Sequence, residues 1–516
     1  MNKSYNTNYL KIYFWKTLRI ISGILSMTIV IPLISYNTEI YGIYVLCISI
    51  ASFLQYTDFG FLSAGQKYAS EYFALNEIKN EIKMLGFVHF IMLIFLLICT
   101  CVILFFSWQP NFIIPKLNSN SSELASNLFF ILGITTPIIL LQRYTQSVFT
   151  IRIHDDIYQK IDLLANVLKI SCVYFFQEDN SIDILSYFIF IQALNFLTVI
   201  FSVFYIKYRY KYQIKLIFKS FKFDIIMYEK TKSLAFSSII STISWIIFFQ
   251  FDSFIISKLF GINSVAIYAI PFFLLTFINN LYNTIYYPFL FRFNYFIVSK
   301  NDTQLYEFIN KIFDLTFPIF IIPVTILILL MKPLIISWVG AGYIDSILIG
   351  QILITSIYFI FINMPYTYLM ISLEKTRILN INSLILPVIF LLLIFVLKNG
   401  NSLLVVAIAK TSAFFISSLF LYFSFRIKNF SFLNFISKRI LSICFSIITL
   451  FFVYHAFNKY LQIEANSTYS IVKTISFGLT LASISLIVYL SFSKDLFLFG
   501  KNILISALSS NKTITK

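Results

Sequence analysis

Several charged residues lie deep inside long apolar runs of this 516-residue sequence. A Lys, Arg or Asp at the centre of a membrane helix costs about 2.5–3.5 kcal/mol, so such a residue marks a functional site by default. Lys169 lies about eight residues from either end of its apolar run, and Lys410 lies nine and thirteen residues from the two ends of its own. Neither lysine can easily reach water along its helix, so we expect both to line a polar cavity. A buried structural ion pair is the alternative interpretation.

Four further charged residues are close to the ends of their runs. Arg143 lies six residues, about 9 Å, from one end, a distance that an arginine side chain can nearly cover. It therefore either lines the cavity or reaches the interface. Asp252 and Asp58 can pair with a cavity cation, titrate during ion coupling, or cap a helix. Asp162 is expected to begin a helix as its N-terminal cap.

Amide side chains also occur at membrane depth, and Gln250 and Asn166 are the two that we include among the candidate site residues. Such amides can bind a polar ligand, and hydrogen bonding between helices explains them equally well. The three histidines are far apart in the sequence, and the five cysteines lie within apolar runs without metal-ligand spacing. We expect no catalytic group, no metal site and no bound cofactor.

The composition indicates the elements that must position these residues. Hydrophobic residues make up 59% of the chain and charged residues only 12%, about half the charge content of a soluble domain. This excludes a nucleic-acid-binding protein, a soluble enzyme and a secreted disulfide scaffold. About 20 apolar residues span a bilayer as a helix, which predicts an all-α polytopic membrane protein. Fourteen runs fit that length, at 17–36, 40–61, 84–107, 125–149, 161–177, 182–206, 234–258, 264–290, 312–331, 346–372, 377–397, 401–423, 439–457 and 471–492.

Basic residues indicate the orientation of these helices. With fourteen spans, 28 Lys and Arg residues fall on one side of the membrane and 4 on the other. Cytoplasmic loops carry the excess of basic residues, so we expect both termini in the cytoplasm. The loop 207–233 has eight basic residues, which are typical of a topology anchor lying against anionic lipid. The net charge of +17 therefore indicates a membrane partner and no nucleic acid.

The sequence also contains an internal repeat. Gly42-Ile43-Tyr44 and Ala266-Ile267-Tyr268 are related by an offset of 224 residues, which maps several first-half runs onto second-half runs. Two parallel six-helix halves are typical of transporters with a substrate site between them. We predict an N-terminal lobe at 1–210, a basic cytoplasmic linker at 211–233, a C-terminal lobe at 234–430, and a final helix pair with its tail at 431–516.

Short motifs in both halves resemble those of polysaccharide flippases. Residues 38–45 read Thr-Glu-Ile-Tyr-Gly-Ile-Tyr-Val and 57–60 read Thr-Asp-Phe-Gly, similar to the "E-x-Y-G-x-Y" turn and "D-x-G" pattern of these proteins. Residues 333–340, Pro-Leu-Ile-Ile-Ser-Trp-Val-Gly, are similar to their "P-L-x-x-x-W-x-G" motif. Over residues 10–425 or so, the sequence resembles the O-antigen (Wzx-type) group of the multidrug/oligosaccharidyl-lipid/polysaccharide (MOP) exporter superfamily. The low arginine count within the spans departs from the family pattern.

The resemblance implies a two-lobed fold like that of MATE transporters and a non-enzymatic function. It implies a flippase of the bacterial inner membrane that moves an undecaprenyl-diphosphate-linked O-antigen or capsular repeat unit by alternating access, as in lipopolysaccharide synthesis. The partners would be this lipid-linked oligosaccharide, membrane lipids, a polysaccharide polymerase and a chain-length regulator; proton or sodium coupling is left open. A multidrug or cation extruder of the same superfamily and a membrane polymerase are the alternatives. The absence of a phosphate-binding G-x-x-x-x-G-K-[ST] loop argues against an ATPase.

Overall fold

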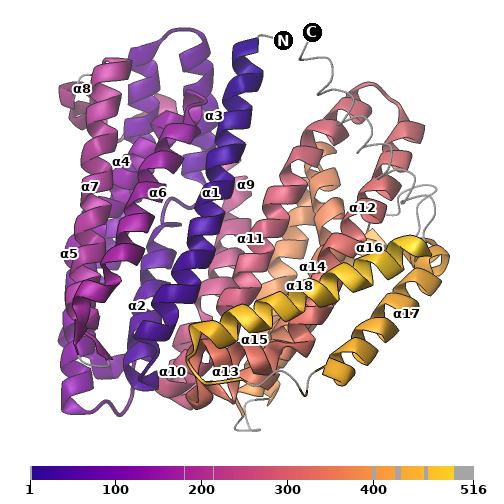
Figure 1. Ribbon diagram of the computed structural model, residues 1–516. Helices are drawn as coiled ribbons and strands as arrows, with labels where there is room; N and C mark the ends of the chain where they lie inside the picture. Colours follow the sequence, from indigo (N-terminus) through magenta and orange to yellow (C-terminus); the bar gives the residue numbers. More distant parts are fainter. Residues whose placement is uncertain are drawn as a thin grey trace, which may run out of the picture. The chain divides into compact units, whose positions relative to one another are not determined.

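The computed structural model describes residues 3–178, 181–212, 214–397, 402–424, 432–457, 459 and 463–492. This part of the chain is almost entirely helical (Figure 1). The only strands in it are β1 (Gln177–Glu178) and β2 (Ser181–Ile182), which form a two-residue antiparallel pair. The predicted all-α fold class is confirmed. The C-terminal tail, predicted to be cytoplasmic, lies outside the described residues.

The chain forms two compact units, Met1–Ala269 and Ile270–Lys516. The helices of the first unit are α1 (Lys3–Ile34), α2 (Thr38–Leu54), α3 (Phe61–Ala74), α4 (Ile78–Trp108), α5 (Ser119–Ile151), α6 (Asp155–Cys172), α7 (Ile184–Tyr210), α8 (Ile214–Ser220), α9 (Ile225–Gln250) and α10 (Asp252–Phe260). Helix α11 (Ile262–Val298) begins in the first unit and continues into the second. The second unit contains α12 (Asp302–Leu329), α13 (Met331–Val339), α14 (Ser346–Ser372), α15 (Thr376–Leu397), α16 (Leu404–Ser424), α17 (Phe432–Phe457) and α18 (Thr468–Ser491).

Each of the fourteen predicted spans overlaps a helix. Eleven helical segments of the described chain are long and apolar enough to cross a membrane, and two shorter apolar helices, Thr38–Leu54 and Leu441–Phe457, match two more predicted spans. The fourteenth, 161–177, corresponds to α6, which begins earlier, at Asp155. The protein is therefore a multi-pass membrane protein. Helices α3, α8 and α13, which lie in predicted loops, were not expected because each is too short to span a bilayer.

Polar residues at the ends of the apolar runs determine where several helices begin. The Asp183 carboxylate accepts hydrogen bonds from the backbone N–H groups of Leu185 and Ser186 at the start of α7. The Asn37 side chain caps α2 in the same way. These caps satisfy N–H groups that have no partner within the helix, so α2 and α7 each start at a defined residue.

The helix bounds repeat at the offset found in the sequence. Helix α4 starts at Ile78 and α12 at Asp302, and α2 starts at Thr38 and α11 at Ile262, so both pairs of starting positions are separated by 224 residues. The packing repeats as well, because the contacts α4–α5, α5–α7 and α6–α7 have counterparts in α12–α14, α14–α16 and α15–α16. The lobe bounds proposed from the sequence stay a prediction.

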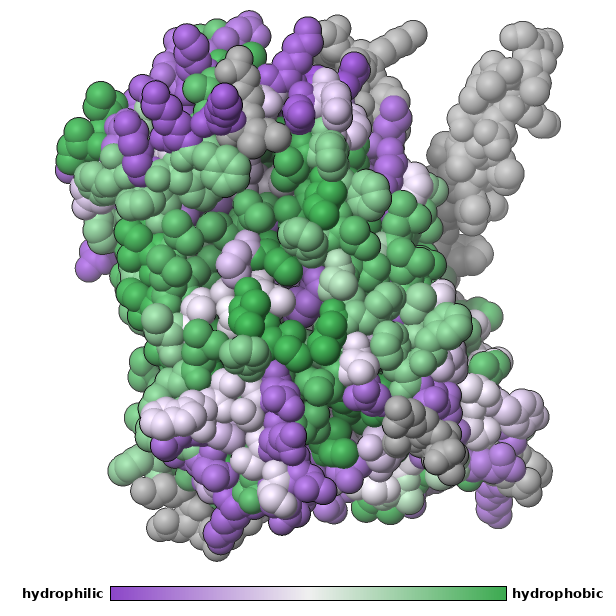
Figure 2. All heavy atoms as spheres, turned by 90° about the vertical axis from the view of Figure 1, so that its left-hand side faces the viewer, coloured by the Kyte–Doolittle hydropathy of each residue, from purple (hydrophilic) through white to green (hydrophobic). Residues whose placement is uncertain are grey.

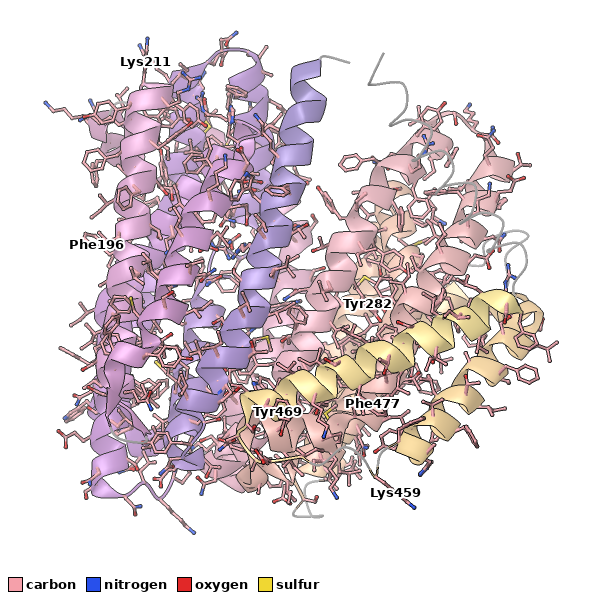
Figure 3. All side chains as sticks on the ribbon, in the orientation of Figure 1. Phe196, Lys211, Tyr282, Lys459, Tyr469 and Phe477 are labelled. Atoms are coloured by element: carbon pink, nitrogen blue, oxygen red, sulfur yellow. The ribbon has the colours of Figure 1, made fainter. Side chains whose placement is uncertain are left out.

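A broad hydrophobic surface covers the side of the first unit that faces the viewer in Figure 2, with hydrophilic residues gathered at both ends. Phe196 of α7 points outward from this unit, and Lys211 lies at the end of the same helix (Figure 3). Phe196 is 49% exposed and Phe201 is 62% exposed. In water these side chains would be unfavourably hydrated, whereas lipid tails solvate them.

Candidate functional site

Lys169 takes part in a polar seam between three helices of the first unit. Its Nζ donates a hydrogen bond of 2.9 Å to Oδ1 of Asn195 on α7, and Nδ2 of Asn195 donates to Oε1 of Gln192 at 3.3 Å. From α5, Nε2 of Gln142 donates to Oγ1 of Thr198 at 3.2 Å. Asparagine is a neutral acceptor, so this hydrogen bond brings no negative charge to Lys169. Of the described carboxylates, none lies within ion-pair distance of it.

An ion pair connects α1 to α6 close to this seam. Nε of Arg19 lies 2.6 Å from Oδ2 of Asp162, with side-chain exposures of 44% and 22%. Nη1 of Arg19 also donates to Oε1 of Gln159 at 3.3 Å. Asp162 is seven residues beyond the first residue of α6, so its prediction as an N-terminal cap is wrong. Its carboxylate instead neutralises a guanidinium of the neighbouring helix.

Arg143 of α5 reaches across to the segment between α2 and α3. Its Nη2 donates to the backbone oxygen of Gln55 at 3.1 Å, and its Nη1 donates to Oε1 of Gln146 at 3.3 Å. The guanidinium lies 5.9 Å from the centroid of the Tyr56 ring, which in turn lies 4.4 Å from the ring of Trp245. All of these partners are neutral, so none of them neutralises the Arg143 guanidinium.

Asp58 has a local structural role at the start of α3. Its Oδ2 accepts hydrogen bonds of 3.1 Å from the backbone N–H groups of Gly60 and Leu62. Gly60 has φ 85°, and a Cβ atom there would lie 2.6 Å from Cβ of Ser238 on α9. The glycine therefore provides both the left-handed turn and the close approach of α9, and Asp58 stabilises the turn.

Asp252, the first residue of α10, is 2% exposed. Its Oδ2 accepts a hydrogen bond of 2.9 Å from the Tyr268 hydroxyl. Gln250 is the last residue of α9 and is half-buried. Asn166 is half-buried on α6, three residues before Lys169, so the two share one face of the helix.

Lys410 is the candidate in the second unit. It lies within α16, is 0% exposed, and its Nζ lies 4.3 Å from the Phe272 ring centroid and 5.3 Å from the Phe390 ring centroid. An ammonium over an aromatic face is stabilised by the ring quadrupole. Subtracting the 224-residue offset from Lys410 gives Ser186, and adding it to Lys169 gives Leu393. Each half thus carries one of the two candidate lysines, and their positions do not correspond under the repeat.

Sequence reasoning missed a second ion pair, which is buried at one end of the first unit. Nη2 of Arg152, which follows α5, lies 3.0 Å from Oε2 of Glu81 on α4, and the Glu81 side chain is 0% exposed. The Tyr212 hydroxyl donates to Glu81 Oε1. The Arg152 guanidinium also lies 4.6 Å from the Tyr210 ring centroid and 4.7 Å from that of Phe73. No local sequence pattern indicates this pair, because the partners of Arg152 are 71 and 60 residues away in the sequence.

The described residues contain no group of three His, Cys, Asp or Glu side chains that could hold a metal ion. The first unit brings together Lys169, Asn166 and the Arg19–Asp162 pair around α6, while Arg143 and Asp58 flank the turn before α3. Gln250 and Asp252 lie at the junction of α9 and α10. The arrangement provides cationic groups beside neutral amides, which can bind an anionic, hydroxyl-rich ligand.

Comparisons with known proteins identify the fold. No protein-family model matches the sequence, and no curated protein does. Among solved structures, the lipid II flippase MurJ in an inward closed conformation matches with a TM-score of 0.65 and 17% identity, over 95% of this chain and 99% of that chain. An inward-facing MATE family multidrug resistance transporter of the MOP superfamily matches with a TM-score of 0.63 and 12% identity, over 80% and 93%. The chain therefore has the fold shared by the MurJ flippase and the MATE transporters of the MOP superfamily.

Proposed function

We propose that the protein is a flippase that moves a lipid-linked oligosaccharide, joined to its undecaprenyl tail by a diphosphate, across the bacterial inner membrane. The repeat unit of an O-antigen or capsule is the oligosaccharide that the sequence motifs favour. The fold supports transport by alternating access of two lobes. Similarity to MurJ over nearly the whole chain supports a lipid-linked substrate.

The observation that carries this proposal is the charge of the membrane-embedded polar groups. Lys169 and Arg143 donate their hydrogen bonds to neutral acceptors, and Lys410 lies against two aromatic rings. Two of the carboxylates have local roles, because Asp58 caps a turn and Asp162 neutralises Arg19. Lys169 and Arg143 then offer positive charge to a diphosphate, which is the anionic part of the substrate.

The neutral side chains fit the remainder of the substrate. Asn195, Gln192, Asn166 and Gln250 provide amide donors and acceptors that can bind sugar hydroxyls. The undecaprenyl tail needs no polar partner and can stay in the surrounding lipid. A multidrug extruder of cationic compounds would instead need carboxylates directed at its substrate, and this makes it the weaker candidate.

Replacement of each lysine tests the proposal. Lys169→Ala and Lys410→Ala should each reduce transport at least tenfold, because the diphosphate would lose a charge-assisted contact worth about 1.5–3 kcal/mol. Lys169→Arg should restore part of the rate, since it restores the positive charge. The measurement is the transfer of a fluorescent diphosphate-linked oligosaccharide to the outer leaflet of proteoliposomes, detected with an impermeant lectin.

Lys473→Ala is the matched control. Lys473 is half-buried on α18, and its removal should leave transport unchanged. Normal transport by both Lys169→Ala and Lys410→Ala would show that these lysines are structural and would overturn the site assignment. Failure of the wild-type protein to transfer any diphosphate-linked sugar, together with export of organic cations, would overturn the flippase proposal itself.

A further inference from the structure

A pocket at one end of the first unit is lined by four lysines. It has a volume of about 240 Å³ and is formed by the first turns of α4 and by the linker that contains α8. Its charged residues are Lys79 and Lys83 from α4, with Lys219, Lys222 and Asp224 from the linker. We call this the lysine pocket.

The positive charge of the lysine pocket is not neutralised by the surrounding protein. Oδ1 of Asp224 accepts hydrogen bonds from the backbone N–H groups of Ile226 and Met227 at 3.0 and 3.2 Å, and so caps α9. In the described part of the chain, none of the four lysines has a carboxylate within ion-pair distance. Four ammonium groups thus surround one carboxylate that already has two donors.

The pocket is held in shape by close packing of α8 on α4. Gly86 has no room for a side chain, because a Cβ atom there would overlap Oγ and backbone atoms of Ser220. Ser220, which lines the pocket, is 7% exposed. The linker backbone is therefore in direct contact with α4, and this contact holds Lys219 near Lys79 and Lys83.

The opposite side of α8 is apolar and locates the pocket at the membrane surface. Ile217, Phe218 and Phe221 line a second pocket of about 380 Å³ together with apolar residues of α4, α5 and α7. Phe218 is 72% exposed. Helix α8 follows Lys211 at the end of the long apolar helix α7 (Figures 1 and 3). A short helix with lysines on one side and exposed aromatics on the other lies at the level of lipid headgroups.

We propose that the lysine pocket binds the phosphate of an anionic glycerophospholipid, with the headgroup against Lys79, Lys83, Lys219 and Lys222. Each lysine close to an anionic membrane surface contributes about 1 kcal/mol, so several together select an anionic lipid over a zwitterionic one. A soluble phosphate compound would leave Phe218 and the apolar side of α8 in water. The site is independent of the transported substrate and would anchor the linker to the membrane.

Native mass spectrometry of the full-length protein in nonionic detergent tests this proposal. Dioleoyl phosphatidylglycerol should bind the wild-type protein more tightly than dioleoyl phosphatidylcholine does. The double variant Lys83→Gln/Lys219→Gln should weaken phosphatidylglycerol binding about 25-fold, because the loss of each lysine weakens it about fivefold. The control variant Lys300→Gln/Lys332→Gln removes the same amount of positive charge at two exposed lysines of the second unit. It should leave phosphatidylglycerol binding unchanged.

Lys83→Arg/Lys219→Arg keeps both charges and should bind phosphatidylglycerol like the wild type, so it separates loss of charge from a change in the fold. Equal affinity for phosphatidylcholine would overturn the proposal. It would equally be overturned if inorganic phosphate displaced the lipid at matched concentration, or if the control pair weakened binding as much as the pocket pair. Because the assay measures lipid binding alone, its outcome does not depend on transport.

Discussion

Loss of Arg152 should destabilise the protein far more than loss of Arg19, although both arginines make an ion pair. The Arg152 side chain is 10% exposed and that of its partner Glu81 is 0% exposed. Arg152→Met would leave the Glu81 carboxylate buried with the Tyr212 hydroxyl as its remaining hydrogen-bond donor among the contacts described above. Breaking a buried pair in this way costs about 3–5 kcal/mol. Because Arg152 keeps a small exposed fraction, we expect about 3 kcal/mol.

Arg19→Met serves as the control, and a double variant that also replaces Glu81 tests the cost of the unpaired carboxylate. Arg19 is 44% exposed and Asp162 is 22% exposed, so Arg19→Met should cost no more than about 1 kcal/mol. Glu81→Gln/Arg152→Met removes both buried charges and keeps a hydrogen-bonding group for Tyr212. It should therefore be more stable than Arg152→Met alone by about 1 kcal/mol or more.

Equilibrium unfolding in mixed micelles of sodium dodecyl sulfate and a nonionic detergent measures these free energies, with the helical circular dichroism signal as the readout. The reasoning would be refuted if Arg152→Met and Arg19→Met lowered the free energy of unfolding equally. It would also be refuted if adding Glu81→Gln to Arg152→Met caused a further loss. Either result would mean that burial does not determine the strength of these ion pairs.

Three further predictions concern orientation, backbone geometry and the polar seam. A cysteine placed at Lys222 should react with an impermeant maleimide only from the cytoplasm, and one at Asn118 only from the periplasm; the reverse labelling would contradict the orientation predicted from the basic residues. Gly60→Ala should lower the melting temperature, since its φ of 85° and the 2.6 Å approach of Ser238 admit no Cβ, whereas Gly342→Ala, where a Cβ meets nothing within 4 Å, should not. Asn195→Asp should place a carboxylate at the Lys169 ammonium and reduce flipping without loss of stability; unchanged flipping would show that the charge of Lys169 is not used.

Sequence alone determined where the long apolar helices lie and that they are helices. A membrane helix needs about 20 apolar residues and satisfies its own backbone hydrogen bonds, so each apolar run predicts a helix without knowledge of its neighbours. The 224-residue repeat was also visible in the sequence, because it depends on local motifs and on the spacing of the runs. Lys169 and Lys410 could be selected as candidates because a charge at membrane depth is costly wherever the helix packs.

The partners of these charges were decided only by the tertiary structure. Arg19 and Asp162 pair across α1 and α6, and Glu81 and Arg152 pair across α4 and the end of α5, at separations that no local pattern encodes. The start of α6 at Asp155, which changed the role of Asp162, depends on polar residues that hydropathy places outside the span. The lysine pocket likewise exists because α8 packs on α4 at Gly86. Hydropathy is a sum over adjacent residues, whereas an ion pair or a pocket depends on which helix faces lie against each other.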